Sequence, residues 1–261
     1  MCDEAENCRS ADIIVYISPV YYIKYASNGG NTGSVGNTTC YYGYDCKLNN
    51  NGFGRTGYYF TKWNINGTEY NAGSNVKNLS STDGQTLTAN ASWHGNAYYI
   101  TYNANGGSGA PGNQTKSHGT NITLSGTKPT RGGWEFVGWN SSSTAHSSQY
   151  NPSSTYSANS NITLYAVWKK TVTVKFKKNE AKWGDNQTKT CSYYQNQTQC
   201  SIKAPDVPRP SGTNAAGQSY SELFSYKGWN TSSSATSSNF NQQASKNFSD
   251  DATYYSVIKF T

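Results

Sequence analysis

Apolar and polar residues alternate at the start of three long segments of the chain. The alternating stretches are 21–25 (YYIKY), 99–102 (YITY) and 172–176 (VTVKF). A period of two places successive side chains on opposite faces of a strand. The first two stretches run on into Asn-Gly-Gly, where glycine permits positive φ in a turn. Each segment is therefore predicted to open with a β-strand.

Each segment also ends on a strand-like stretch, namely QTLTANASW (85–93), NITLYAVW (161–168) and TYYSVIKF (253–260). This recurrence predicts three repeats, 21–95, 96–170 and 171–261, the third one divergent. Residues 1–20 are predicted to form a strand or cap with a short disulfide loop. The joints, 94–97 and 169–171, are brief, so we expect three small domains in an extended rod.

Composition favours an all-β protein. The chain has 22 Tyr and 25 Gly among 261 residues, whereas the usual helix formers are scarce. Only 34% of residues are apolar, but 14% are aromatic, so the cores should be built from Tyr, Trp and Phe. Helix content should be low, with a single turn expected within residues 73–84.

Three tryptophans stand at the same position of the three repeats: Trp63, Trp139 and Trp229. Repetition at one register favours a core aromatic, because every copy must fill the same volume. The alternative is a platform on which sugars stack. Trp93 and Trp168 close the first two repeats and are assigned to the same aromatic core.

Six cysteines form three pairs that are close in sequence: Cys2 with Cys8, Cys40 with Cys46, and Cys191 with Cys200. Zinc sites favour two-residue spacings and histidine partners, which these pairs lack. Local hairpin closure is the simplest connectivity. The middle repeat has Lys116 and Ile122 in place of a pair, so the bridge is optional to the fold. Structural disulfides are favoured over redox or metal roles, and they indicate a compartment outside the cytosol.

The net charge of +7 is too diffuse to indicate a partner, and we expect no nucleic-acid binding. The densest basic run comprises Lys169, Lys170, Lys175, Lys177, Lys178 and Lys182. Within an alternating strand these lysines should form a solvated face. Binding of anionic wall polymers or host glycosaminoglycans is the alternative. The sequence contains no apolar stretch long enough to span a bilayer.

No set of residues indicates catalysis. His94, His118 and His146 do not recur between repeats and lack metal-ligand spacing. No pair of acidic residues recurs either, so a glycosidase-type dyad has no support. We therefore expect a protein that is not an enzyme, with no catalytic residue, metal site or cofactor.

The middle unit resembles the Listeria–Bacteroides repeat, also called the internalin B-repeat. The resemblance rests on YNANGG, KPTRGGWEFVGW, Tyr150 and NITLYAVW, and the first unit is similar through GRTGYYFTKW and Tyr70. It implies compact β-grasp-like (ubiquitin-like) modules, found in tandem in secreted and cell-surface bacterial proteins. The third unit departs from the pattern, because NGG becomes KNEAKWGD and the terminal Trp becomes Phe260.

These observations predict a monomeric, non-catalytic stalk or spacer of the bacterial cell surface, with a role in adhesion to a host or neighbouring cell. Its partner would be a surface protein or glycan. The alternative function is a ligand-binding module for glycans or cell-wall polymers.

Overall fold

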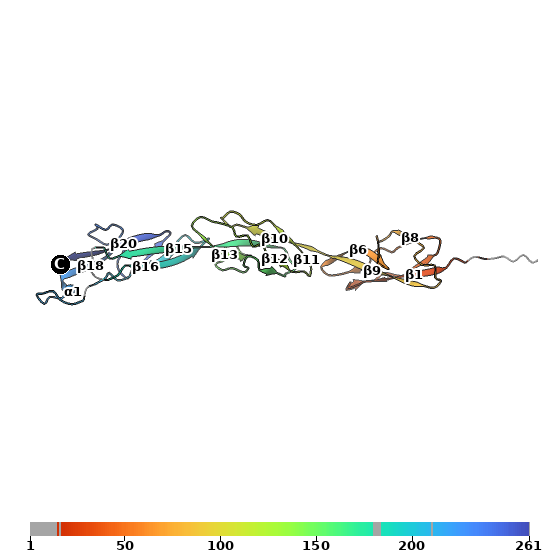
Figure 1. Ribbon diagram of the computed structural model, residues 1–261, viewed down its shortest axis with the longest axis horizontal. Helices are drawn as coiled ribbons and strands as arrows, with labels where there is room; N and C mark the ends of the chain where they lie inside the picture. The colour runs from red at the N-terminus through yellow and green to blue at the C-terminus, as the bar shows by residue number, and fades with distance from the viewer. Residues whose placement is uncertain (1–14, 16, 180–183, 210, 261) are drawn as a thin grey trace, which may run out of the picture. The chain divides into compact units, whose positions relative to one another are not determined.

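The computed structural model describes residues 15, 17–179, 184–209 and 211–260 (Figure 1). These residues are mainly β, as predicted, and their one helix is the four-residue α1 (Tyr220–Leu223). The chain forms two compact units. One comprises Met1–Tyr98 with Ser117–Thr120, and the other comprises Tyr99–Lys116 with Asn121–Thr261.

Repeat 1 contains a five-stranded sheet in the order β3-β1-β9-β6-β7. Its opening and closing strands lie side by side and parallel, with Ile23 opposite Leu87. The other neighbours in this sheet are antiparallel. The strands of repeat 1 are β1 (Val20–Ala26), β2 (Thr32–Gly33), β3 (Thr38–Tyr41), β4 (Asp45–Lys47), β5 (Phe53–Gly54), β6 (Tyr58–Ile65), β7 (Thr68–Tyr70), β8 (Asn75–Lys77) and β9 (Thr86–Gly95).

Repeats 2 and 3 share one seven-stranded sheet, because strand β15 belongs to both. The strands are β10 (Ala97–Asn103), β11 (Gln114–Ser117), β12 (Ile122–Thr123), β13 (Glu135–Asn140), β14 (Thr155–Tyr156), β15 (Ile162–Lys177), β16 (Gln187–Tyr194), β17 (Cys200–Lys203), β18 (Phe224–Asn230), β19 (Ser245–Phe248) and β20 (Ala252–Phe260). The first half of β15 pairs with β10 in parallel and with β13 antiparallel. Its second half pairs with β16 antiparallel and with β20 in parallel. The order of repeat 1 thus recurs as β11-β10-β15-β13 and as β16-β15-β20-β18.

Each repeat adds a small two-stranded sheet to its main sheet: β4 with β8, β12 with β14, and β17 with β19. Each repeat also has its own cluster of buried residues. Trp63, Trp139 and Trp229 lie in these clusters, one in each, and all three are fully buried. The hydrophobic face of each main sheet is therefore covered within its own repeat.

A β-bulge recurs just before each core tryptophan, between Phe60 and Lys62 in repeat 1 and at Gly138 and Gly228 in the others. Gly138 has φ of +146°, and a Cβ there would lie 2.5 Å from the Cβ of Ser148. A side chain would therefore be excluded from this position, which explains the Gly-Trp pair of repeat 2.

Two predictions about local structure are wrong. Residues 169–171 are not a linker but the middle of β15, and residues 94–97 lie almost entirely in β9 and β10, which are separated by Asn96 alone (Figure 1). The helical turn expected within 73–84 is absent, and β8 occupies residues 75–77 of that stretch instead. Pairing with neighbouring strands outweighed the polar, loop-like composition of both regions.

Candidate functional site at the stapled hairpins and repeat junctions

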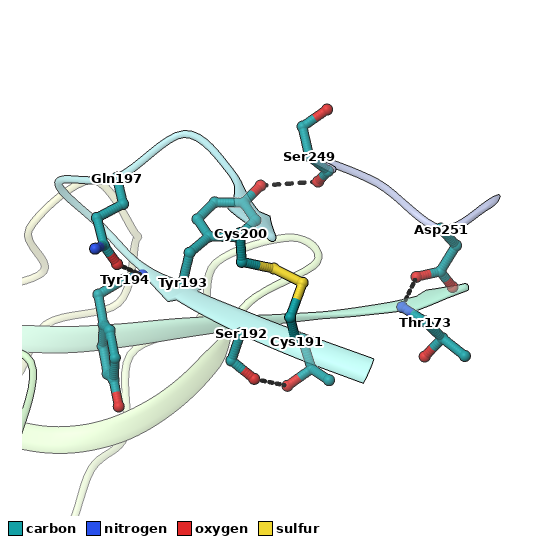
Figure 2. The surroundings of a disulfide bond; sticks show 10 residues. Thr173, Cys191, Ser192, Tyr193, Tyr194, Gln197, Cys200, Ser249 and Asp251 are labelled. Atoms are coloured by element: carbon teal, nitrogen blue, oxygen red, sulfur yellow. Dashed lines mark hydrogen bonds between the residues drawn. A yellow bond between two sulfur atoms is a disulfide. The ribbon is translucent and has the colours of Figure 1, made fainter. Parts of the chain in front are cut away.

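A disulfide joins Cys191 of β16 to Cys200 of β17 in repeat 3, with the Cα atoms 5.9 Å apart (Figure 2). Because β16 belongs to the main sheet and β17 to the small sheet, the bridge ties the two sheets together. The Tyr193 hydroxyl, beside the bridge, donates to the Ser249 carbonyl over 2.8 Å. Repeat 3 thus has its edge strand fixed by a covalent bond and by side-chain hydrogen bonds.

The second disulfide, Cys40–Cys46, connects β3 to β4 at the same place in repeat 1, with the Cα atoms 5.4 Å apart. Both sulfur-bearing side chains are buried. All four cysteines of the described residues are therefore paired, and in both repeats the bridge closes the hairpin that leads away from the edge strand. The predicted pair Cys2 and Cys8 lies outside the described residues.

Repeat 2 has a polar contact where the other repeats have a disulfide. Lys116 on β11 is buried at 2% exposure, and its Nζ donates to the Asn159 Oδ1 over 2.7 Å. Ile122 on β12 is partly buried and packs against the core cluster of repeat 2. In repeat 2 the bond of Lys116 thus ties β11 to the loop before β15, while β11 and β12 are joined by the Gln114 Nε2, which donates to the Thr123 carbonyl over 3.0 Å.

This equivalence predicts that Lys116→Cys combined with Ile122→Cys will form a disulfide. The two positions are six residues apart, as are Cys40 and Cys46. Closing a loop of this length should raise the free energy of unfolding of repeat 2 by about 2–3 kcal/mol relative to the reduced form of the same variant. Mass spectrometry under non-reducing conditions should show a loss of about two hydrogen masses. Two free thiols under oxidising conditions would show that the hairpins of repeats 1 and 2 are not equivalent.

The two closing tryptophans contact the turn after the opening strand. The Trp93 Nε1 donates to the Ser27 carbonyl, and the Trp168 Nε1 to the Ala104 carbonyl, each over 2.8 Å. Trp168 is fully buried, whereas Trp93 is only partly buried. A Cβ on Gly107 would lie 2.5 Å from the Trp168 ring, so the second glycine of NGG leaves room for the closing tryptophan.

The hairpin turn of repeat 2, Ser117–Thr120, lies in the first compact unit and packs against repeat 1. The His118 backbone N–H donates to the Asn96 carbonyl over 2.8 Å. Its ring meets the Tyr58 ring edge-on, with centroids 5.0 Å apart. The Tyr98 hydroxyl and the His118 Nδ1 are 3.0 Å apart. This turn is therefore held by Tyr58 of repeat 1 and by Asn96 and Tyr98 at the start of its own repeat.

The hairpin turn of repeat 3 makes corresponding contacts with repeat 2. Tyr194 stacks on the His146 ring with centroids 4.6 Å apart and planes 10° apart, and Tyr193 meets the Trp134 ring edge-on. The Gln195 Nε2 donates to the Ala145 carbonyl over 2.7 Å, and its Oε1 accepts from the Trp168 backbone N–H over 2.9 Å. A turn residue of one repeat thus bonds to a loop and to the closing strand of the repeat before it.

One lysine of the basic run is paired. The Lys170 Nζ lies 2.6 Å from the Asp250 Oδ1. This hydrogen bond raises the pKa of Lys170 and lowers the pKa of Asp250. The pair contributes little, because Asp250 is exposed and salt screens it. Lys175 and Lys177 point to solvent as predicted for a solvated face, and Lys182 lies outside the described residues.

Comparison with known families identifies the repeats. Residues 21–89 and 98–167 each match the Listeria-Bacteroides repeat domain. The chain belongs to this family. The resemblance drawn from the sequence of the first two units is thereby confirmed. The third unit lies outside the matched residues, although its strands follow the same order. No curated protein matches the chain.

Elsewhere in the described residues of this repeat protein, no group of three or more His, Cys, Asp and Glu is placed to hold a metal ion. No helix in that part of the chain is long and apolar enough to cross a membrane. The sequence did not indicate the roles of His118 and His146. Both lie in repeat 2, where His118 contacts Tyr58 of repeat 1 and His146 contacts Tyr194 of repeat 3.

Proposed function

We propose that this chain is a non-catalytic spacer segment of a secreted or cell-surface bacterial protein, with a role in adhesion. In this proposal it holds a binding domain elsewhere in the protein at a distance from the bacterial envelope. The observation that carries the proposal is strand β15, which runs for 16 residues from the closing strand of repeat 2 into the opening strand of repeat 3. A joint made of paired strand resists bending more than a flexible linker does.

The module itself is proposed to be a β-grasp-like domain. Two features support this. The opening and closing strands are central and parallel, and the first hairpin and the bulged strand lie on either side of them. In the spacer role, the mechanical connection through each module would pass along these two central strands.

The disulfides support a location outside the cytosol, where such bonds persist. Each bridge ties an edge strand to the small sheet next to it, and edge strands are where a β-domain is most readily opened. A stapled edge would therefore resist local unfolding and proteolysis, which an exposed spacer must withstand.

Small-angle scattering of the full chain tests the spacer proposal. Three domains of roughly 75 residues in line should span roughly 90–100 Å, with a radius of gyration of about 28 Å. A compact globule of this length would have a radius of gyration of about 18 Å. We expect the larger value at every concentration, and a value near the smaller one would contradict the proposal.

A glycan array probed with the full chain separates the spacer from a glycan-binding module. A spacer should bind none of the glycans on the array. Saturable binding to a defined wall polymer or host glycan would instead favour the alternative function.

A further inference from the structure

The first hairpin turn of each repeat differs in its surroundings: two turns contact another repeat and one is exposed to solvent. The turn of repeat 2 packs on repeat 1 through His118, and the turn of repeat 3 packs on repeat 2 through Tyr194 and Gln195. The corresponding turn of repeat 1, residues 41–44 (YYGY), has three tyrosines that are largely exposed. Tyr41 is 52% exposed, Tyr42 39% and Tyr44 64%.

This tyrosine turn is rigidly held. Cys40 and Cys46 bridge its two ends. The Tyr42 backbone N–H donates to the Pro19 carbonyl over 2.8 Å, and the Gly43 N–H donates to the Asn78 Oδ1 over 2.6 Å. Three aromatic side chains on a turn with little freedom lose little entropy when they are covered, as in Tyr-rich binding loops.

An apolar recess lies beside the tyrosine turn. It is lined by Ile17, Ser18, Val20, Tyr41 and Tyr44, and Ile17 is 83% exposed. An exposed apolar surface of this kind on a monomeric domain marks an interaction site. In repeats 2 and 3 the equivalent hairpin turns contact the repeat in front.

We propose that the tyrosine turn and this recess are a docking surface for the closing end of another repeat of the Listeria-Bacteroides family. The two junctions within the chain define the chemistry of that end. It offers an aromatic ring at the start of the bulged strand, as Tyr58 and Trp134 do, and in repeat 2 also a loop carbonyl, that of Ala145, which accepts a hydrogen bond from the turn of the next repeat. A tyrosine turn matches both features, because its rings pack against the aromatic residue and its hydroxyl groups can donate to the carbonyl.

The observations favour a protein repeat over a sugar as the occupant. Equivalent turns in the same chain contact a repeat in both other cases. The residues that line the recess are Ile17, Ser18, Val20, Tyr41 and Tyr44, and none of them is an acidic or amide side chain of the kind that binds sugar hydroxyls. The proposal deepens the spacer function, since it gives the first repeat the same kind of junction as the other two.

The test adds one repeat in front of repeat 1. A copy of residues 98–168 is joined directly to Ile17 in place of residues 1–16. Its last tryptophan then stands five residues before Tyr21, as Trp93 stands five residues before Tyr98. A second fusion uses residues 21–93 in the same way, so that the result does not depend on the folding of one added copy. Tyrosine nitration, mapped by mass spectrometry, reports the exposure of each ring.

We expect nitration of the three turn tyrosines to fall about fivefold or more in at least one fusion relative to the chain alone. Tyr59 and Tyr99, which are 53% and 55% exposed, serve as internal references and should react as before. The protection should disappear when the aromatic contact residue of the added copy, equivalent to Trp134 or Tyr58, is changed to Ser.

Turn tyrosines that stay fully reactive in both fusions would overturn the proposal, as would protection that survives the Ser substitution. Glycan binding by the unmodified chain that is lost on Tyr42→Ser would also overturn it, in favour of a sugar as the occupant. An extended scattering profile with unprotected tyrosines would leave the spacer function standing while removing this docking surface.

Discussion

Replacing Trp139 by alanine should lower the free energy of unfolding of repeat 2 by about 3–5 kcal/mol. The Trp139 side chain is fully buried and meets the Tyr102 and Phe136 rings with centroids 5.0 and 5.1 Å away. Its indole Nε1 is buried without a hydrogen-bond partner among the described residues, unlike the Nε1 of Trp63, which donates to the Asn49 carbonyl. The loss should therefore measure packing alone.

Hydrogen exchange is the appropriate measurement, because one free energy of unfolding is not defined for a chain of several domains. The slowest amides of β15 opposite β13, such as those of Ala166 and Val167, should exchange about a hundredfold to several thousandfold faster in Trp139→Ala. Amides of β1 and β9 in repeat 1 should be unchanged.

Trp139→Phe is the matched control, since it keeps an aromatic ring in the same volume and should cost less than half as much, about 1–2 kcal/mol. A second control, Tyr99→Ser on an exposed side chain, should change stability by less than about 0.5 kcal/mol. If Trp139→Ala left repeat 2 intact and abolished binding of a sugar, the ring would be a binding platform instead of a core residue.

Periodicity in the sequence was sufficient to predict the strands that open and close each repeat. Alternating side chains in 21–25 and 172–176 become alternating buried and exposed positions in β1 and β15. Local alternation carries this information because each strand has one face on the core. The three equivalent tryptophans follow from a different signal, the recurrence of motifs when the repeats are aligned.

The parallel pairing of the opening and closing strands could not be predicted in this way. It joins residues such as Ile23 and Leu87, more than sixty positions apart, and a period of two contains no information about which strands are neighbours. The joint between repeats 2 and 3 was misjudged for a related reason. Lys169-Lys170-Thr171 has the polar composition of a linker. In the structure, however, Lys169 pairs with Glu135 of repeat 2 and with Tyr194 of repeat 3.

The sequence also contains a relation between the second glycine of NGG and the closing tryptophan, on which no prediction was based. Gly107 and Trp168 occupy adjoining space, so the second glycine of NGG and the closing tryptophan depend on each other. Repeat 3 lacks both, with KNEAKWGD in place of NGG and Phe260 in place of tryptophan. The joint loss of these two residues, which are distant in the sequence, is consistent with the contact between their equivalents in repeat 2.

Removing the disulfide of repeat 3 with Cys191→Ser and Cys200→Ser should lower the free energy of unfolding of that repeat by about 2–3 kcal/mol. The bridge closes a short loop between β16 and β17, so its removal releases conformational freedom in the unfolded chain. It also frees the edge of the sheet formed by β16, next to the turn that contacts repeat 2. Hydrogen exchange should therefore accelerate first in β16 and β17.

Repeat 1 provides the matched comparison, because Cys40→Ser with Cys46→Ser should destabilise repeat 1 and leave the amides of β16 unchanged. Reductant should act on the wild-type chain as the substitutions do. It should reach Cys191–Cys200 first, since both of these cysteines are partly exposed whereas Cys40 and Cys46 are buried. Repeat 2, residues 96–170, contains no cysteine, so it should not respond to reductant at all. Equal acceleration in all three repeats would mean that the bridges stabilise the chain as a whole, and the view of independently stapled modules would have to be abandoned.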